Sequence, residues 1–162
     1  MTNNNKMEKA TFGAGCFWKV EAAFSKIKGI ISTSVGYMGG HFPNPSYLDV
    51  LARITGHAEV AQIEYDPEKI SYDQLLEIFW NIHDPTSLNR QGADRGEQYR
   101  SVIFYHSKEQ EATARKSKEN LKKSGKYDKD IVTEIKPAGA YYLADEYHQQ
   151  YLEKKAAKRE KK

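Results

Sequence analysis

Cysteine is almost absent from this sequence, because Cys16 is the only one among 162 residues. A single cysteine cannot form an internal disulfide, which excludes the small disulfide-stapled folds of secreted proteins. Long apolar runs are also missing, since no stretch reaches the roughly 18 residues that a membrane-spanning helix needs. The first ten residues, MTNNNKMEKA, lack the apolar centre of a signal peptide. We therefore expect a soluble, reduced, cytoplasmic protein that uses no membrane as a partner.

A strong charge of either sign is missing from most of the chain. The net charge of +3 comes from residues 153–162, EKKAAKREKK, which carry six basic and two acidic side chains. The remaining residues are nearly balanced, with 19 basic and 20 acidic side chains. The basic tail has no aromatic residue, whereas nucleic-acid-binding surfaces usually interleave the two types. We interpret the tail as a solvated helix end and expect no nucleic acid as a partner.

The length of the chain predicts a single domain. A chain of 162 residues buries enough surface to fold without disulfides or a metal. We expect residues 1–162 to form one catalytic domain, with residues 1–7 as a flexible tail and residues 153–162 as a basic tail. No metal site is expected.

The hydrophobic pattern alternates between strand and helix signals. Segments rich in β-branched or alternating apolar residues predict strands over 8–13, 30–37, 57–65, 101–105 and 130–135. Helical spacing and capping boxes predict helices from Cys16 to Gly29 and over 71–83, 107–125 and 143–155. Several connections are too short for right-handed crossovers between parallel strands. The pattern therefore predicts an α+β fold, a two-layer α/β sandwich around a mixed sheet.

Two segments carry loop signals. Residues 38–46, MGGHFPNPS, are dense in Gly, Pro and Asn, and residues 84–100, DPTSLNRQGADRGEQYR, are polar without periodicity. Loops of more than about 12–15 residues in compact domains tend to be functional or disordered. The second segment is therefore a candidate contributor to a functional site.

The lone thiol lies in the stretch GAGCFW, at the first turn of a predicted helix. Unpaired backbone N–H groups and the helix dipole favour an anion there, which predicts a lowered thiol pKa. The alternative is an inert buried cysteine. Trp18 lies about 100° away from the apolar stripe of this helix. It walls a small apolar pocket or packs against a neighbouring loop.

Five motifs carry a resemblance to a known family. GCFW after a strand, GYMGGHFPNPSY, TGHAEVAQIEYDP, HDPTSLNRQGADRGEQYRS and HQQYL occur in order between about residues 10 and 152. In sequence and spacing they resemble the A-type peptide methionine sulfoxide reductases. The resemblance implies a ferredoxin-like core and reduction of the S epimer of methionine sulfoxide, free or in proteins.

The resemblance also implies a role for each matched residue. Cys16 matches the nucleophile, whose thiolate attacks the sulfoxide sulfur, and Glu59 matches the acid that protonates the sulfoxide oxygen. Strand alternation independently places Glu59 on the face of Ala61 and Ile63, where burial would raise its pKa. The remaining matches are two tyrosines that hold the sulfoxide oxygen, a polar site residue and two residues around the S-methyl group: Tyr47, Tyr99, Asp94, Phe17 and Trp18. His41, His57 and His83 receive no catalytic role.

One departure from the family pattern concerns recycling. Many relatives carry further cysteines near the C-terminus, but this chain has none. The Cys16 sulfenic acid would therefore need an external thiol, such as glutathione, glutaredoxin or thioredoxin, and no other cofactor. We expect a monomer. Two alternatives remain at this point, a cysteine-nucleophile hydrolase and a non-catalytic binding module.

Overall fold

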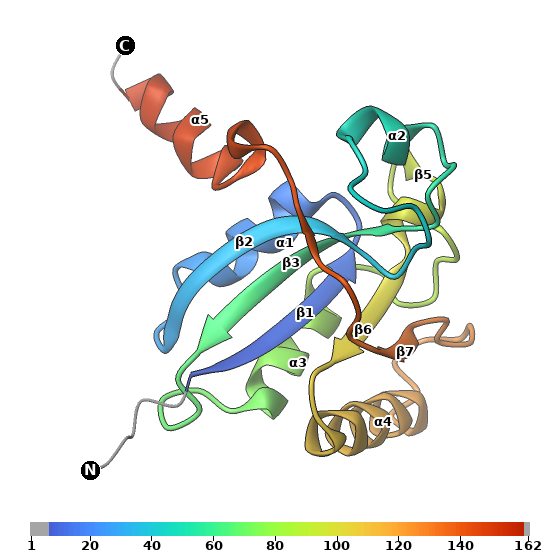
Figure 1. Cartoon of the computed structure of the whole chain (residues 1–162). Helices are drawn as coiled ribbons and strands as arrows, with labels where there is room; N and C mark the ends of the chain where they lie inside the picture. The colour runs from blue at the N-terminus through green and yellow to red at the C-terminus, as the bar shows by residue number, and fades with distance from the viewer. Residues whose placement is uncertain (1–6, 161–162) are drawn as a thin grey trace.

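The computed structural model describes residues 7–160, so the predicted flexible tail over residues 1–7 lies, apart from Met7, outside the described residues. Six strands form one sheet in the order β7-β6-β1-β3-β2-β8 (Figure 1). β6 and β7 run parallel, whereas the other neighbours are antiparallel. The strands are β1 (Glu8–Ala14), β2 (Ile30–Met38), β3 (Ala58–Tyr65), β6 (Ser101–Tyr105), β7 (Glu134–Pro137) and β8 (Tyr142–Leu143). The predicted mixed sheet is confirmed.

Helices α1 and α3 lie behind the sheet in the view of Figure 1, and α4 lies at its lower edge. The α-helices are α1 (Phe17–Ser25), α2 (Tyr47–Leu51), α3 (Tyr72–Asn81), α4 (Lys108–Lys123) and α5 (Tyr151–Glu160). Two 3₁₀ turns, η1 (Glu97–Tyr99) and η2 (Glu146–His148), complete the structure together with a small ribbon of β4 (Arg90–Gln91) and β5 (Asp94–Arg95). None of the helices within residues 7–160 has the length and apolar character needed to cross a bilayer.

The centre of the molecule is the ferredoxin-like core that the sequence predicts. This core consists, in chain order, of β1, α1, β2, β3, α3 and β6. Its strands lie in the spatial order β6-β1-β3-β2. β1 and β2 are both antiparallel to β3, which lies between them, so β1-α1-β2 is a split βαβ unit. This arrangement brings the start of α1 beside the end of β1 and the start of β3.

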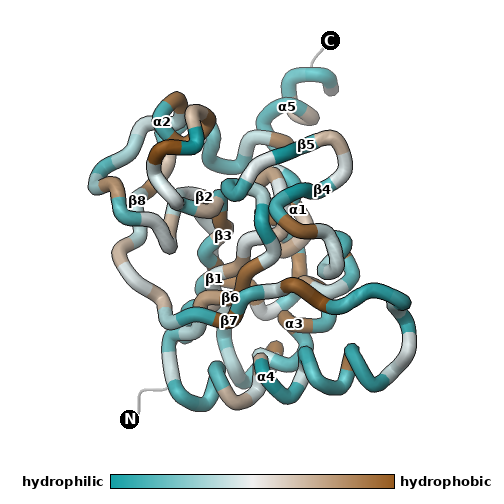
Figure 2. The backbone as a smooth tube through the Cα atoms, turned by 90° about the vertical axis from the view of Figure 1, so that its right-hand side faces the viewer, coloured by the Kyte–Doolittle hydropathy of each residue, from teal (hydrophilic) through white to brown (hydrophobic). Residues whose placement is uncertain are grey.

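The main hydrophobic core fills the space between the sheet and helices α1 and α3. Phe12 of β1 stacks on Phe24 of α1 and Phe79 of α3, with ring centroids 5.5 and 5.0 Å apart. Fully burying each such ring contributes about 1.5–3 kcal/mol. Figure 2 shows the hydrophobic residues concentrated in the central strands, whereas α4 and α5 are largely hydrophilic. The core thus fixes α1, whose first residue follows Cys16.

The opposite face of the sheet is covered by a strap, residues 138–150, which crosses in front of it in Figure 1. A second apolar cluster lies beneath the strap, where Ala138 and Tyr141 pack on Met38, Ala58, Val60, Val102 and Phe104. The Tyr141 hydroxyl and Ser34 Oγ are 2.7 Å apart and share a hydrogen bond. The strap then pairs with β2 through β8 and leads into α5.

Several predicted boundaries are wrong, and tertiary contacts explain them. The strand predicted over 130–135 begins only at Glu134, because Val132 donates its N–H to the Pro85 carbonyl and Thr133 contacts Ser101. The helix predicted over 143–155 begins only at Tyr151, because the preceding residues form β8 and η2.

Helix capping was only partly predicted. The Ser71–Gln74 box at α3 is confirmed. At α4 the Ser107 side chain accepts from the Gln110 N–H, but the Gln110 side chain accepts from the His106 N–H, so the predicted box is incomplete. A further box, Ser46–Asp49, starts α2, which the sequence reasoning missed.

Candidate functional site

Cys16 occupies the N-cap position of α1, as the sequence predicts. Its carbonyl oxygen accepts the first helical hydrogen bonds, from the N–H groups of Lys19 at 3.1 Å and Val20 at 3.3 Å. Gly15 precedes it with φ +98°, a conformation that favours glycine, and a Cβ there would lie only 3.0 Å from the Gln91 side chain. The two constraints together fix the backbone that carries the half-buried thiol.

The prediction of a lowered thiol pKa is wrong. Burial, and after it the negative charge of Glu59, raise the pKa of Cys16 from 9.0 to about 11. The backbone N–H groups of Trp18 and Lys19 lower the pKa, but by less than these two effects raise it. Sequence position shows the helix start, whereas burial and a neighbouring carboxylate depend on the tertiary fold. The unliganded site therefore holds a thiol at neutral pH.

Glu59 lies on β3, on the helix-facing side of the sheet, as strand alternation predicts. Its side chain is only 1% exposed, and Oε1 accepts the N–H of Phe17 at 3.1 Å. Oε2 has no hydrogen-bond partner among the described residues. Burial raises its pKa from 4.5 to about 7, against the lowering effect of the Phe17 N–H, and the charge of Asp94 adds to the rise. Glu59 can therefore hold a proton near neutral pH, and its carboxyl contacts the backbone of Phe17, the residue that follows Cys16.

The two predicted tyrosines and the predicted aspartate come from three other segments. Tyr47 begins α2, Tyr99 ends η1 and Asp94 lies in β5. Burial raises the pKa of both phenols, followed by the charge of Glu59, so both remain protonated hydroxyls. Asp94 lines a pocket of about 190 Å³ that Cys16 also lines. The fold thus gathers all the predicted polar residues around the start of α1.

Phe17 and Trp18 form apolar walls on either side of the helix start. Phe17 is fully buried and packs against Tyr37 and His148, with ring centroids 5.6 and 5.3 Å apart. Trp18 is half-buried and stacks on Tyr151 at 3.8 Å with an interplanar angle of 11°. The indole ring is thus held by the C-terminal segment.

His148 is a site residue that the sequence reasoning missed. It is fully buried, and its Nδ1 accepts the indole N–H of Trp18 at 3.0 Å. Because an indole only donates, Nδ1 carries no proton and the neutral ring is protonated at Nε2. The ring of Tyr47 lies 4.5 Å from it. The motif HQQYL and the need of Trp18 for an acceptor were the available signals.

Gln149 anchors His148, and with it the wall that His148 forms against Phe17 and Trp18, to the sheet. Its side-chain oxygen accepts the Val35 N–H at 2.8 Å, and its amide nitrogen donates to the carbonyls of Val35 and Ala144, both at 2.9 Å. Gln150 adds hydrogen bonds to the buried Glu21 of α1. The second and third residues of HQQYL therefore fix the position of the first.

The His148 contact gives a first testable prediction. His148→Phe is expected to shift the indole N–H resonance of Trp18, because the acceptor is lost while the ring volume is kept. It should also destabilise the fold by about 1–3 kcal/mol in urea unfolding, the cost of a donor left unsatisfied. The other indole provides an internal control, since Trp80 donates to Ser117 Oγ at 2.8 Å and should not shift. An unchanged Trp18 resonance would contradict the hydrogen bond.

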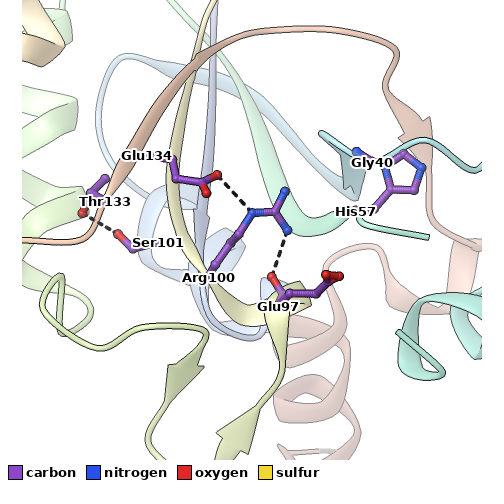
Figure 3. A network of polar contacts seen from close by, with 7 residues as sticks. All are labelled: Gly40, His57, Glu97, Arg100, Ser101, Thr133 and Glu134. Atoms are coloured by element: carbon purple, nitrogen blue, oxygen red, sulfur yellow. Dashed lines mark hydrogen bonds and ion pairs between the residues drawn. The ribbon is translucent and has the colours of Figure 1, made fainter. Parts of the chain in front are cut away.

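A polar network fixes the segment that carries Tyr99 (Figure 3). The Arg100 guanidinium donates to the Glu97 carbonyl at 2.9 Å and to Glu134 Oε1 at 3.2 Å. Ser101 Oγ and Thr133 Oγ1 are 2.7 Å apart in the same network. Because Arg100 links the start of this turn to Glu134 of β7, the turn that carries Tyr99 is held against β7.

The histidines have structural partners. His57, drawn beside Gly40 in Figure 3, accepts the Gly40 N–H at Nδ1, 2.9 Å away. Its Nε2 lies 2.8 Å from the Phe42 carbonyl. His83 lines the same pocket as Cys16, but its two ring nitrogens contact the Phe79 carbonyl and Ser101 Oγ, both at 2.7 Å. Burial lowers the pKa of His83 to about 4. Neither ring is therefore free to act as a base toward the thiol.

A cavity of about 720 Å³ lies away from Cys16, between α4 and β7, and is lined mainly by charged side chains. Across residues 7–160 no group of three or more His, Cys, Asp or Glu side chains could hold a metal ion. The chemically distinctive site is therefore the small one at the start of α1.

Comparisons with known proteins agree with this geometry. The model of the peptide methionine sulfoxide reductase family matches residues 8–162. Peptide methionine sulfoxide reductase MsrA 1 of Nostoc sp. is 70% identical over 150 residues, which cover 93% of this chain and 92% of that protein.

Solved structures show the same fold. The reduced form of Mxr1 from Saccharomyces cerevisiae superposes with a TM-score of 0.88 at 36% identity, covering 96% of this chain and 90% of that one. The same yeast protein in complex with Trx2 gives a TM-score of 0.65 at 27% identity, covering 93% and 88% of the two chains.

Proposed function

The chain belongs to the peptide methionine sulfoxide reductase family, and from this premise we propose how its residues reduce methionine sulfoxide to methionine. The substrate is the S epimer of the sulfoxide, free or in proteins, and Cys16 is the nucleophile. The observation that supports this proposal most directly is the pairing of the lone thiol with a buried carboxyl, Glu59, whose pKa is about 7.

In the first stage the Cys16 sulfur attacks the electron-poor sulfur of the sulfoxide. Glu59 gives its proton to the sulfoxide oxygen, which weakens the S–O bond, and takes the thiol proton in return. The hydroxyl passes to Cys16, so the products are methionine and a Cys16 sulfenic acid. The high thiol pKa fits this order, because activation comes from the protonated substrate rather than from a standing thiolate.

Other residues around the start of α1 orient the sulfoxide. We assign the hydroxyls of Tyr47 and Tyr99 to hydrogen bonds with the sulfoxide oxygen, since both phenols stay protonated. We assign Asp94 to the polar side of the pocket that Cys16 also lines. Phe17 and Trp18 enclose the S-methyl group, whose burial contributes only about 0.8 kcal/mol, so their main effect is to select one epimer by orientation.

In the second stage an external thiol restores Cys16. The chain has no second cysteine, so a disulfide cannot form within it. We propose thioredoxin, or glutathione with glutaredoxin, as the reductant. The structure of the yeast relative with Trx2 supports the first of these. Recycling of this kind needs a reduced thiol pool, which favours a cytoplasmic location. We also propose that the protein acts as a monomer.

The hydrolase alternative is not supported. A cysteine hydrolase needs a histidine that bonds to the thiol and is oriented by a third group. The histidine nearest to this arrangement, His83, is engaged at both ring nitrogens.

Mass spectrometry tests the proposal. Protein mixed with the S epimer of methionine sulfoxide and a sulfenic-acid trap should form one methionine per chain and one trapped adduct at Cys16. Added thioredoxin system should convert this single turnover into continuous reduction. The R epimer is the matched control and should give neither product. A Cys16 that stays unmodified in excess sulfoxide, in a properly folded protein, would refute the proposed function.

A further inference from the structure

A third phenol, Tyr37 of β2, lies beside Glu59 and has no role in the mechanism above. Tyr37 and Glu59 are direct cross-strand partners in the antiparallel pairing of β2 with β3. Side chains of such partners lie on the same face of a sheet, with their Cβ atoms about 4.5–5.5 Å apart. Both residues are 1% exposed. The two side chains therefore share one dry compartment.

Each of the two side chains has an unsatisfied polar atom. Among the described residues the Tyr37 hydroxyl and Glu59 Oε2 have no hydrogen-bond partner. Glu59 Oε1 is already occupied by the Phe17 N–H, and the Tyr37 ring packs against the Phe17 ring at 5.6 Å. A buried polar group without a partner costs about 1–3 kcal/mol. We expect this free-energy cost to be offset at another stage of the reaction cycle, when the two atoms gain a hydrogen bond.

We propose that Tyr37 is a positioning residue whose hydroxyl donates a hydrogen bond to Glu59 Oε2 when Glu59 becomes a carboxylate during sulfoxide reduction. The inference rests on the proposed function, in which Glu59 is a carboxylate after it releases its proton to the sulfoxide oxygen and before it takes up the thiol proton. Oε2 then needs a donor, and the phenol beside it is protonated and otherwise unpartnered. A hydrogen bond to a charged group is stronger than one to a neutral group, so the contact favours the transition state over the resting enzyme.

The pH dependence of Glu59 depends on every group that faces it. These groups come from the start of α1, β2, α2, β5 and η1, and they are Cys16, Tyr37, Tyr47, Asp94 and Tyr99. Substitution of Tyr37 by phenylalanine leaves the other four unchanged and keeps the ring against Phe17. Its effect on the titration of Glu59 is therefore specific to the hydroxyl.

The experiment compares Tyr37→Phe with Tyr72→Phe. Tyr72 is a matched control, because its hydroxyl is also buried without a partner but its ring stacks on Phe12, in the core between sheet and helices. Tyr37→Phe is expected to lower kcat about 10- to 100-fold and to move the basic limb of the pH profile to higher pH, with a thermal unfolding midpoint that is not lowered. Tyr72→Phe should leave kcat and the pH profile unchanged.

Two further measurements separate this inference from its premise. In a Glu59→Gln background, Tyr37→Phe should cause no additional loss, since the group through which it acts is gone. Carboxyl ¹³C NMR of the unliganded protein should show a higher Glu59 pKa in Tyr37→Phe than in the wild type. An unchanged rate, or a loss that persists in the Glu59→Gln background, would overturn the inference. A wild-type protein without reductase activity would instead overturn the proposed function.

Discussion

Replacement of Cys16 by serine is expected to remove sulfoxide reduction to the background level, a loss of at least about 10⁴-fold, as for other catalytic nucleophiles. A serine oxygen is a far weaker nucleophile toward sulfur, and it has no sulfenic acid state that a thiol could reduce. The expected result is measured as methionine released per chain, with and without thioredoxin.

Serine is close to cysteine in size, so the fold should be kept. Circular dichroism and the Trp18 indole resonance check this, since the Trp18–His148 hydrogen bond lies next to the substituted position. The assay with thioredoxin is a second control. Because this chain has no other cysteine that could replace Cys16, thioredoxin should not restore activity to the variant. Residual turnover in folded Cys16→Ser, above that of the reductant alone, would exclude Cys16 as the nucleophile.

Glu59→Gln should give the second-largest effect, a fall in kcat of about 10²- to 10⁴-fold, which is the usual contribution of a general acid. Glutamine keeps an acceptor for the Phe17 N–H, so the start of α1 should stay in place. It removes the transferable proton and the buried charge. Steady-state kinetics with thioredoxin in excess measures the loss, and full activity in this variant would remove Glu59 from the mechanism.

Thiol labelling provides a matched control for this variant. The Glu59 charge raises the pKa of the Cys16 thiol, so its removal should lower that pKa. Glu59→Gln should therefore react faster with iodoacetamide at neutral pH than the wild type, although it reduces sulfoxide more slowly. Opposite changes in the two rates would show that the nucleophile is intact and that the acid is missing.

The raised pKa of Glu59 also fixes the sign of two pH dependences. The acid must be protonated to act, so kcat/KM should fall as pH rises through about 7. Between about 4.5 and 7 the folded state binds more protons at this position than the unfolded state, so stability contributed here is lost as pH rises through that window. In Glu59→Gln neither pH dependence should remain at position 59. Comparison with the wild type therefore separates the contribution of Glu59 from those of the other titrating groups.

The sequence was informative where a residue and its neighbours in the chain determine the outcome. Alternation along β3 placed Glu59 on the buried face, and the Ser71–Gln74 box placed the start of α3. The turn at Gly15 and the helix that follows placed Cys16 at an N-cap. Each of these depends on local geometry with a fixed period or spacing.

Features that depend on distant contacts could not be predicted in the same way. The thiol pKa is set by burial and by a carboxylate 43 positions away in the chain, and these outweigh the local effect of the helix start. The late start of α5 follows from the pairing of β8 with the distant β2 and from the 3₁₀ turn η2, which occupy the residues before Tyr151. The placement of Tyr37 beside Glu59 depends on the register between β2 and β3.

The Gln149 anchor has a consequence for biosynthesis. A ribosome releases the nucleophile at residue 16 early, but the wall that holds Trp18 arrives only with residue 148, after nearly all of the sheet has emerged. Until then the growing polypeptide exposes the Cys16 thiol, because the residues that complete its site are not yet present. Until His148 has been synthesised, the growing chain lacks the wall against which a substrate is oriented, and products that end before it never acquire that wall.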